Sequence, residues 1–314
     1  MILKTLPQDE YELIDTGEGQ KLERYGPYVL CRPDPEAIWK KILPQDKWKN
    51  ADMEFIRNGN RTKWITKEGV AKNWNISFGN LSFQITPSSF KHTGLFPEQL
   101  LNWQWMENVI KNRFVSSQTA PSGPRVKSPD HAVSLSNSAN QIPRVLNLFA
   151  YTGGATLACA KAGAEVCHVD GSKTAVLWAR RNAELSGLKN APIRWIVEDV
   201  LMFLRREIKR GHRYDAIIMD PPSFGHGPKD ELWKIESNFL ELMELCKQIL
   251  SDKPLFVLIN GYTAGYSAIA YQNNLMYMME GYNGNIEIGE LTIKETSTER
   301  LLPCGIFARW SNIV

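Results

Sequence analysis

The chain has 314 residues, is 43% hydrophobic and 23% charged, and carries a formal net charge of +3 at pH 7. These values are ordinary for a globular protein with room for two domains, and the weak basic charge permits nucleic-acid binding without arguing for it. No apolar run approaches the roughly 20 residues of a membrane span, and residues 1–10 turn acidic too soon for a secretory signal.

The cysteines favour a reducing compartment. They include no C-x-x-C pair and their number is odd, so free thiols in a cytoplasmic protein are expected. They are Cys31, Cys159, Cys167, Cys246 and Cys304. No cluster of His, Cys and Asp has metal-ligand spacing, so no metal site is predicted.

Residues 1–90 are predicted to form a small β domain. Short strands are expected at residues 11–14, 21–24, 28–31, 63–66, 74–78 and 81–85, with turn signals between them. One short helix is expected after Pro35, over residues 36–41.

Basic and aromatic residues interleave in the second half of this domain. The pattern is typical of a surface that follows a phosphate backbone and stacks bases. A solvated β surface with tryptophans in its own core also explains it, and both interpretations stay open. The residues are Lys40, Lys41, Lys47, Lys49, Arg57, Arg61, Lys63, Lys67 and Lys72, with Trp39, Trp48, Trp64 and Trp74.

Residues 91–143 are expected to bridge the β domain to a second domain. An apolar stripe predicts a helix over residues 97–114. Residues 116–141 are rich in Ser, Pro, Gly and Asn and have no period, which predicts a long mobile loop.

Residues 144–314 alternate between strand and helix patterns. After a first strand from residue 145, strands are predicted at 165–169, 194–197, 214–219 and 254–259, followed by a final pair at 286–293 and 305–310. Helices are predicted at 155–161, 173–186, 200–209, 229–250 and 264–280. Five β/α units of this kind predict an α/β fold with a parallel sheet.

A nucleotide-binding corner is expected at the start of this region. The first strand ends at Gly153 and Gly154, where glycine lets the backbone approach a ligand and the next helix offers free N–H groups. Asp170 ends the second strand, 17 residues after Gly153, and an acid there can hold a ribose through its hydroxyls. Asp199 and Asp220 follow the third and fourth strands. A tight turn followed by surface acids is the plainer alternative.

The segment Asp220-Pro-Pro-Ser-Phe224 is the more specific signal. Its prolines, Pro221 among them, stiffen the turn, and the carboxylate and the ring can face a flat substrate.

These motifs together resemble the class I S-adenosylmethionine (SAM) methyltransferases. They are Asn147-x-Phe149-x-Tyr151-Thr-Gly-Gly154, Val169-Asp-x-Ser172, Glu198-Asp-Val200 and the Asp220 segment. Within that class they resemble the bacterial large-subunit ribosomal RNA methyltransferases that make 5-methylcytosine or 7-methylguanine. Phe149 and Tyr151 occupy positions that are glycine in the general class, as is typical of this subfamily.

The resemblance covers roughly residues 90–310 and reaches upstream of the sheet. The family has a Thr-Gly-x-x-x-Asp-Gln segment that closes over the methionine end of SAM, and residues 91–99 are similar to it. Glu98 stands here for the Asp, and no Arg follows Gln99. The resemblance implies a Rossmann-like, seven-stranded sheet with a small N-terminal β domain, and SAM as the cofactor.

The resemblance also implies roles for single residues. Asp170 binds the ribose, with Ser172 beside it. Asp199 accepts a hydrogen bond from the adenine amine or, alternatively, only caps its helix. Gly153 lies by the methionine moiety. The residues expected near that moiety are Asn147, Tyr151 and Thr152, with Thr93, Gly94 and Gln99 from the upstream segment.

In the substrate site, Asp220 orients the target base or its amine. Phe224 stacks on that base or, alternatively, packs its own loop. His92 and His226 are expected beside the cleft, without an assigned role.

Three functions remain open. The first is methylation of a ribosomal RNA base, with RNA as partner. The second is SAM-dependent methylation of a small molecule or a protein, and the third is SAM-binding association with RNA without turnover. Attack by nitrogen is favoured over C5, because C5 chemistry usually needs a cysteine and residues 258–263 contain none.

Overall fold

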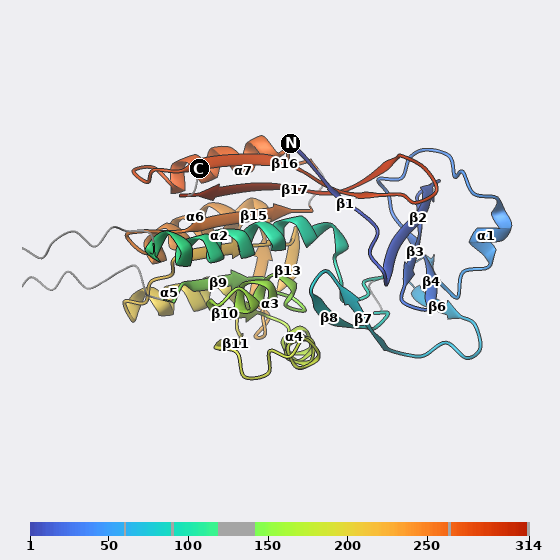
Figure 1. Ribbon diagram of the computed structural model, residues 1–314, viewed down its shortest axis with the longest axis horizontal. Coiled ribbons are helices and arrows are strands. Elements are labelled where there is room, and N and C mark those ends of the chain that lie inside the picture. Colours follow the sequence, from blue (N-terminus) through green and yellow to red (C-terminus); the bar gives the residue numbers. More distant parts are fainter. Residues whose placement is uncertain (60, 89–90, 119–141, 263–264, 313–314) are drawn as a thin grey trace, which may run out of the picture.

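A mixed sheet of eight strands forms the centre of the larger part of the molecule (Figure 1). The computed structural model describes residues 1–59, 61–88, 91–118, 142–262 and 265–312. Five strands are parallel: β9 Arg144–Leu148, β10 Glu165–Asp170, β11 Ile193–Val197, β12 Ala216–Met219 and β15 Phe256–Gly261. The hairpin β16 Asn285–Lys294 and β17 Leu301–Ser311 adds to β15, so the α/β prediction is confirmed.

The sheet has eight strands instead of the predicted seven. The order is β1-β16-β17-β15-β12-β9-β10-β11, and the eighth strand is β1, Ile2–Thr5, from the chain's N-terminal end. It pairs in parallel with β16 and is fixed there by the Thr292 hydroxyl, which donates to the carbonyl of Leu3 at 2.8 Å. Four residues carry too little periodicity to signal an edge strand in the sequence.

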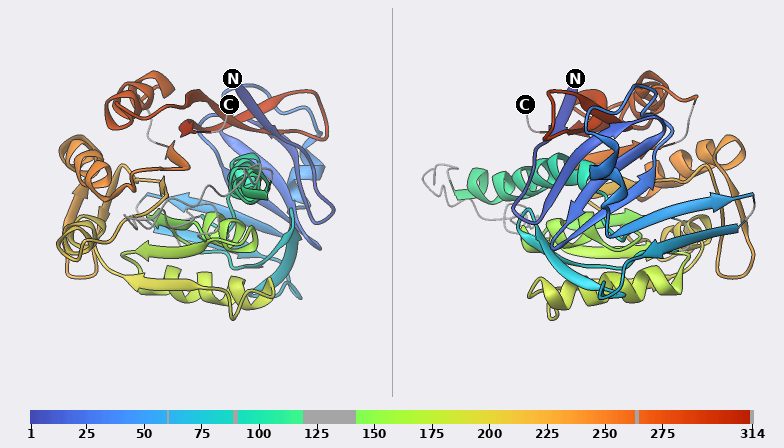
Figure 2. Two further views of the ribbon diagram at one scale, coloured as in Figure 1. Left: turned by 60° about the vertical axis from the view of Figure 1, so that its left-hand side comes forward. Right: turned by 90° about the vertical axis from the view of Figure 1, so that its right-hand side faces the viewer.

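Helices cover both faces of this sheet. On one side lie α2 Leu100–Gln118, α3 Gly154–Lys161 and α4 Lys173–Leu185, and on the other α5 Val200–Lys209, α6 Ile235–Ile249 and α7 Ala268–Met278 (Figure 2). Alternate strand residues enter the two cores: Val145 and Ile218 pack on the α2 side, Leu146 and Ile217 on the α6 side. Because side chains alternate across a strand, two-sided burial requires the continuous apolar runs that the sequence has.

The predicted β domain is present beside the sheet. Its five strands are β2 Tyr11–Gly17, β3 Gln20–Tyr25, β4 Tyr28–Pro33, β5 Met53–Asn58 and β6 Arg61–Thr66, and the hairpin β7 Trp74–Phe78 and β8 Leu81–Ile85 joins it to the larger part. β8 packs against α4. Strand β5 and the short helix α1 Gln45–Lys49 were not predicted.

The predicted helix at 36–41 is wrong. Residues 37–39 instead bond to the turn between β2 and β3, where the N–H groups of Glu18 and Gly19 donate to the carbonyls of Trp39 and Ala37. These tertiary bonds use the carbonyls that a helix would have needed.

Two further predictions need adjustment. The hairpin β13 Phe224–His226 and β14 Leu232–Lys234 replaces the first turn of the helix predicted at 229–250, which begins at Ile235 as α6. The helix predicted at 97–114 begins as the 3-10 turn η1 Pro97–Gln99 and runs on to Gln118 as α2. The rest of the predicted loop, residues 119–141, lies outside the described residues.

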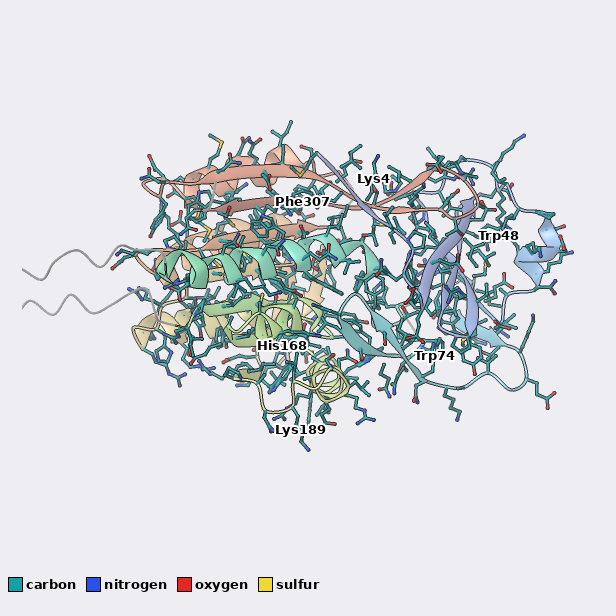
Figure 3. The ribbon with its side chains drawn as sticks, in the orientation of Figure 1. Lys4, Trp48, Trp74, His168, Lys189 and Phe307 are labelled. Carbon is teal, nitrogen blue, oxygen red and sulfur yellow. The ribbon has the colours of Figure 1, made fainter. Side chains whose placement is uncertain are left out.

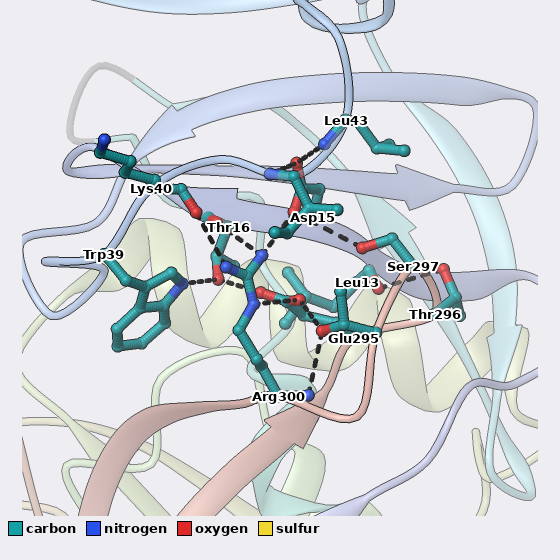
Figure 4. Close-up of polar contacts among 12 residues, drawn as sticks. Leu13, Asp15, Thr16, Trp39, Lys40, Leu43, Glu295, Thr296, Ser297 and Arg300 are labelled. Atoms are coloured by element: carbon teal, nitrogen blue, oxygen red, sulfur yellow. Dashed lines mark hydrogen bonds and ion pairs between the residues drawn. The ribbon is translucent and has the colours of Figure 1, made fainter.

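The β16–β17 hairpin reaches from the sheet into the β domain, where a polar network anchors it (Figure 4). The Arg300 guanidinium donates to Asp15 at 2.7 Å and to Glu295 at 2.9 Å, and both carboxylates are fully buried. The backbone N–H of Thr296 donates to the carbonyl of Leu13 at 2.8 Å. A segment near the C-terminal end of the chain therefore connects the large sheet to strand β2 of the β domain.

No helix in the described part of the chain is long and apolar enough to cross a bilayer. All five cysteines are free thiols. Within the described ranges, no group of three or more His, Cys, Asp and Glu side chains has an arrangement that could hold a metal ion.

Candidate functional site

The loop after β9 has the conformation that a cofactor-binding turn needs. Phe149 and Tyr151 have positive φ angles of 55° and 47°, so they adopt the left-handed conformation of the glycines they replace. Gly153, with φ 89°, precedes α3 as its N-cap. Non-glycine residues in this region store strain, which is typical of ligand-binding sites.

Asp170, at the end of β10, fixes this loop. Its two carboxyl oxygens each accept a backbone N–H at 2.8 Å, one from Tyr151 and one from Ser172. Burial raises the pKa of the Asp170 carboxyl above its ordinary value, and the two N–H groups partly offset this. Because each carboxylate oxygen has a second lone pair, the group can still accept hydroxyl donors from the cavity that it lines.

Two neighbouring residues cap helices. The Ser172 hydroxyl accepts the N–H of Ala175 at the start of α4, and the Asp199 carboxyl accepts the N–H of Met202 at the start of α5. Both also line the cavity. Asp199 therefore caps α5, and its second carboxyl oxygen leaves the predicted adenine contact geometrically open.

A cavity of about 620 Å³ lies between the carboxyl ends of the strands and the β domain. Asp170, Ser172, Asp199 and Tyr151 line one part of it, and the Asp220 segment lines another. The sheet edge, the cavity and the β domain thus meet where open α/β folds bind ligands.

A smaller cavity of about 60 Å³ adjoins the first. Asn147, Thr152, Gly153, Gly94 and Gln99 line it, together with Tyr151, which is shared. These are the residues expected around the methionine moiety, and the structure brings them together. Thr93 is fully buried and is not among the residues that line either cavity.

Polar contacts hold the upstream segment over this smaller cavity. The Thr152 hydroxyl donates to the carbonyl of Gly94 at 2.6 Å. Gly94 has φ 93°, and a side chain there would meet the ring of Trp178. Gln99 donates to the hydroxyl of Tyr262 at 2.6 Å and accepts from Asn102 at 3.1 Å, so its amide is fixed in place.

The Asn147 amide is also committed inside the protein. It donates to the hydroxyl of Thr156 at 2.9 Å, which in turn contacts the His168 ring. Asn147 therefore lines the smaller cavity, and its side chain is oriented by the hydrogen bond to Thr156 of α3.

The Asp220 segment is braced by the hairpin that follows it. The Trp233 indole donates to the carbonyl of Pro222 at 2.6 Å and packs on Phe149, with ring centroids 4.8 Å apart. Pro221 is buried, whereas Phe224 is 54% exposed and contacts the ring of His226. An exposed ring beside a cavity can take a stacked base, while its contact with His226 leaves packing within the loop as the alternative.

Asp220 lines both cavities. Burial raises the pKa of its carboxyl to about 7, and the charge of Glu98 adds to this. A group of this kind in a cleft is typical of functional sites.

His92 lines the large cavity, as does His226, in agreement with their expected places. Burial lowers the pKa of His92 to about 4, with Arg32, Lys91 and Lys21 adding to the effect, so its imidazole is neutral at pH 7.

Some wall residues could not be predicted from the sequence. The β domain contributes Lys21, Arg32 and Asp34, and β17 contributes Cys304. They are brought to the cavity by packing between distant segments, which leaves no local pattern.

Of the four tryptophans of the basic stretch, Trp48 is buried and the other three are half-buried. Trp48 lies on α1, and Trp74 lies on β7 of the neighbouring hairpin (Figure 3). Each of the four indoles donates its N–H within the protein: Trp39 to Thr16, Trp48 to Asp15, Trp64 to Ser88 and Trp74 to Tyr25. The indole N–H groups are therefore used within the protein, whereas Arg57, Arg61 and Lys63 are exposed.

Comparisons with known proteins agree with this geometry. A family model described as S-adenosylmethionine-dependent methyltransferase matches residues 133–251. A SAM-dependent methyltransferase of known structure from Agrobacterium tumefaciens is 36% identical, with a TM-score of 0.87 over 99% of this chain and 93% of that one. The chain therefore belongs to the SAM-dependent methyltransferases.

Two curated relatives are more specific in name. Ribosomal RNA large subunit methyltransferase I of Aeromonas salmonicida is 40% identical over 109 residues, which are 34% of this chain and 27% of that protein. Ribosomal RNA large subunit methyltransferase K of Neisseria meningitidis serogroup B is 34% identical over 119 residues, 37% of this chain and 34% of that protein. The chain thus spans about a quarter to a third of the length of these relatives.

The residues present fit SAM. Asp170 has free lone pairs toward the large cavity, and the smaller cavity adjoins it at the left-handed loop. When bound, SAM supplies a methyl group on an electron-poor sulfonium.

Proposed function

We propose that the protein methylates a base of ribosomal RNA and that the attacking atom is a nitrogen. One observation carries this proposal: a carboxyl, Asp220, and an exposed ring, Phe224, line the same cavity as the acids expected to hold SAM. A base held between Phe224 and the methyl donor, with its amine on Asp220, would be positioned for transfer. The names of the curated relatives support ribosomal RNA as the substrate, and we propose the cytoplasm as the place of action.

Within this proposal, Asp170 holds the ribose, Asp199 accepts the adenine amine, and Tyr151, Thr152, Gly153, Asn147 and Gln99 surround the methionine moiety. Gly94 lines the smaller cavity, and the buried Thr93 packs behind it. The Asp220 carboxyl orients the nucleophile, and the stiff turn at Pro221 keeps that carboxyl in place.

Nitrogen is favoured because a reactive thiol is missing from the expected position. Cys304 does line the cavity, so the β17 strand brings it closer to the site than its place in the sequence implies. Burial raises the pKa of this thiol well above its ordinary value, with Glu98 adding to the effect, and the thiol donates to the carbonyl of Leu302 at 3.4 Å. A protonated thiol is a poor nucleophile for addition to a pyrimidine.

The test of the attacking atom is incubation with SAM and RNA in which cytidine is replaced by 5-fluorocytidine. We expect no protein–RNA adduct that survives denaturation. An adduct that disappears in Cys304→Ala would show that C5 is the target.

The exposed cations of β5 and β6 are proposed to contact the RNA backbone. Phosphate contacts of this kind give affinity without sequence choice, and the exposure of Arg57, Arg61 and Lys63 supports such a role.

A further inference from the structure

Glu98 is a buried carboxyl on the substrate side of the site. It is 6% exposed, and it lines the large cavity, whereas its neighbour Gln99 lines the small one. Both lie in η1, and a 3-10 helix has three residues per turn, so consecutive side chains point in different directions. Glu98 is therefore separated from the compartment expected to hold the methionine moiety.

Asp220 shares that cavity with Glu98, and both carboxyls lack side-chain donors within the described residues. The Glu98 carboxyl accepts a hydrogen bond from its own backbone N–H. Burial raises the pKa of each carboxyl to about 7, and the charge of Glu98 raises that of Asp220 further. Carboxyl oxygens that open on a cavity and lack side-chain donors can accept hydrogen bonds from a ligand that brings N–H groups.

The cations nearby are already engaged. Lys21 pairs with Asp34 at 3.1 Å, and Arg32 pairs with Glu23 at 2.6 Å and donates to the carbonyl of Lys91 at 3.0 Å. The Tyr262 hydroxyl and the Cys304 thiol also lie within the electrostatic influence of Glu98. Charge on the carboxyl pair is therefore only partly balanced by the protein.

We propose that Glu98 acts with Asp220 to read a base edge that carries an amino group, and that Glu98 discriminates against uracil. This rests on the proposed function, because it assumes that a nucleobase enters the large cavity. Adenine, cytosine and guanine each offer the hydrogens of an amino group. Uracil offers one N–H between two carbonyl oxygens, which would face the carboxylates as unpaired acceptors.

The test uses RNA tetranucleotides U-N-U-U, with N varied among the four bases, bound to protein saturated with S-adenosylhomocysteine. Fluorescence anisotropy should show that the best amino-bearing base binds at least about tenfold more tightly than uracil, the discrimination of one good base contact. Glu98→Gln should remove about tenfold of that preference. The Kd of SAM, measured by calorimetry, should stay within about twofold of the wild-type value.

Two further variants separate a reading role from a structural one. Glu98→Asp keeps the charge and should keep the preference. Glu290→Gln changes an exposed glutamate on β16 and should alter neither measurement. Thermal melting identifies any variant that fails to fold. If Glu98→Gln does not fold, Glu98→Asp is the deciding variant. Loss of the preference for an amino-bearing base in a folded, SAM-binding Glu98→Asp protein overturns the inference.

A wild-type protein without a preference, or a Glu98→Gln protein that keeps it, overturns the inference. Weaker SAM binding with an unchanged base preference does so too, because it would make Glu98 a cofactor residue. These measurements need no methyl transfer. A clear base preference without methylation of ribosomal RNA would reject the proposed function and leave the role of Glu98 standing.

Discussion

Among the single carboxyl groups proposed to act in this site, Asp170 is the one assigned to the cofactor. Its oxygens are oriented by two backbone N–H groups, so a bound ribose would meet a preformed acceptor. Asp170→Ala should weaken SAM binding by roughly 1.5–3 kcal/mol, or about 10- to 100-fold in Kd. Calorimetry measures this, with the exposed Asp252→Ala as control; an unchanged Kd in Asp170→Ala would remove the ribose assignment.

Asp220 also makes the stability depend on pH. Its folded pKa of about 7 lies above the ordinary value of 3.8, so the folded protein binds more protons than the unfolded chain between these pH values. The contribution to stability is therefore present below pH 4 and is lost as the pH rises through 7. Asp220→Asn removes this titration, so its Tm relative to wild type should increase between pH 5 and pH 8.

The comparison of the two melting curves is needed because other groups titrate in the opposite sense. His92 has a lowered pKa of about 4, so its contribution is lost as the pH falls from 6.5 through 4. That effect is common to both proteins. Parallel Tm curves for wild type and Asp220→Asn would contradict the raised pKa.

At the scale of elements, the β16–β17 hairpin connects the sheet to the β domain through Arg300. Asp15 and Glu295 are fully buried, and Arg300→Met would leave both without their cation. Removing one partner of a buried pair costs about 3–5 kcal/mol. We expect a loss of about 3 kcal/mol in the free energy of unfolding, measured by denaturant titration, because Arg300 is partly exposed.

The same hairpin provides the control. Lys294 pairs with Glu299, whose side chain is 91% exposed, so Lys294→Met should cost less than about 1 kcal/mol. Equal losses in the two variants would show that the buried network does not hold the two parts together.

Much of the larger part could be predicted from the sequence. Buried parallel strands need apolar runs, and Ser172 and Asp199 cap α4 and α5 where the spacing predicts. The β13–β14 hairpin could not be predicted, because it depends on Trp233 bonding to Pro222 across the turn. The helix predicted at residues 36–41 does not form for a similar reason, because N–H groups of the turn at Gly19 bond to carbonyls of this segment.

For the site, the acids at the strand ends were predicted and all line the cavity. The sequence patterns around Glu98 and Cys304 did not predict that both residues line the large cavity. Their positions there depend on how η1 and β17 pack. Local pattern identifies which residues end a strand, but it does not identify which distant segment faces them.

At the scale of the whole molecule, the β domain presents exposed cations on β5 and β6. Replacing Arg57, Arg61 and Lys63 with Ala should weaken binding to ribosomal RNA. It should also flatten the dependence of log K on log salt concentration, by about 0.7–0.9 for each lost phosphate contact. Filter binding over a range of salt concentrations measures the slope. An unchanged slope would mean that these exposed side chains are an ordinary solvated surface.

The most direct test of the account is to map methylated nucleotides in ribosomal RNA by mass spectrometry. RNA would be compared from a parent strain, a strain lacking the gene, and that strain supplied with wild type or with Asp220→Asn. We predict a nitrogen-methylated base in large-subunit RNA that is lost on deletion, restored by wild type and not restored by Asp220→Asn. Identical methylation in the ribosomal RNA of all four strains would contradict the account.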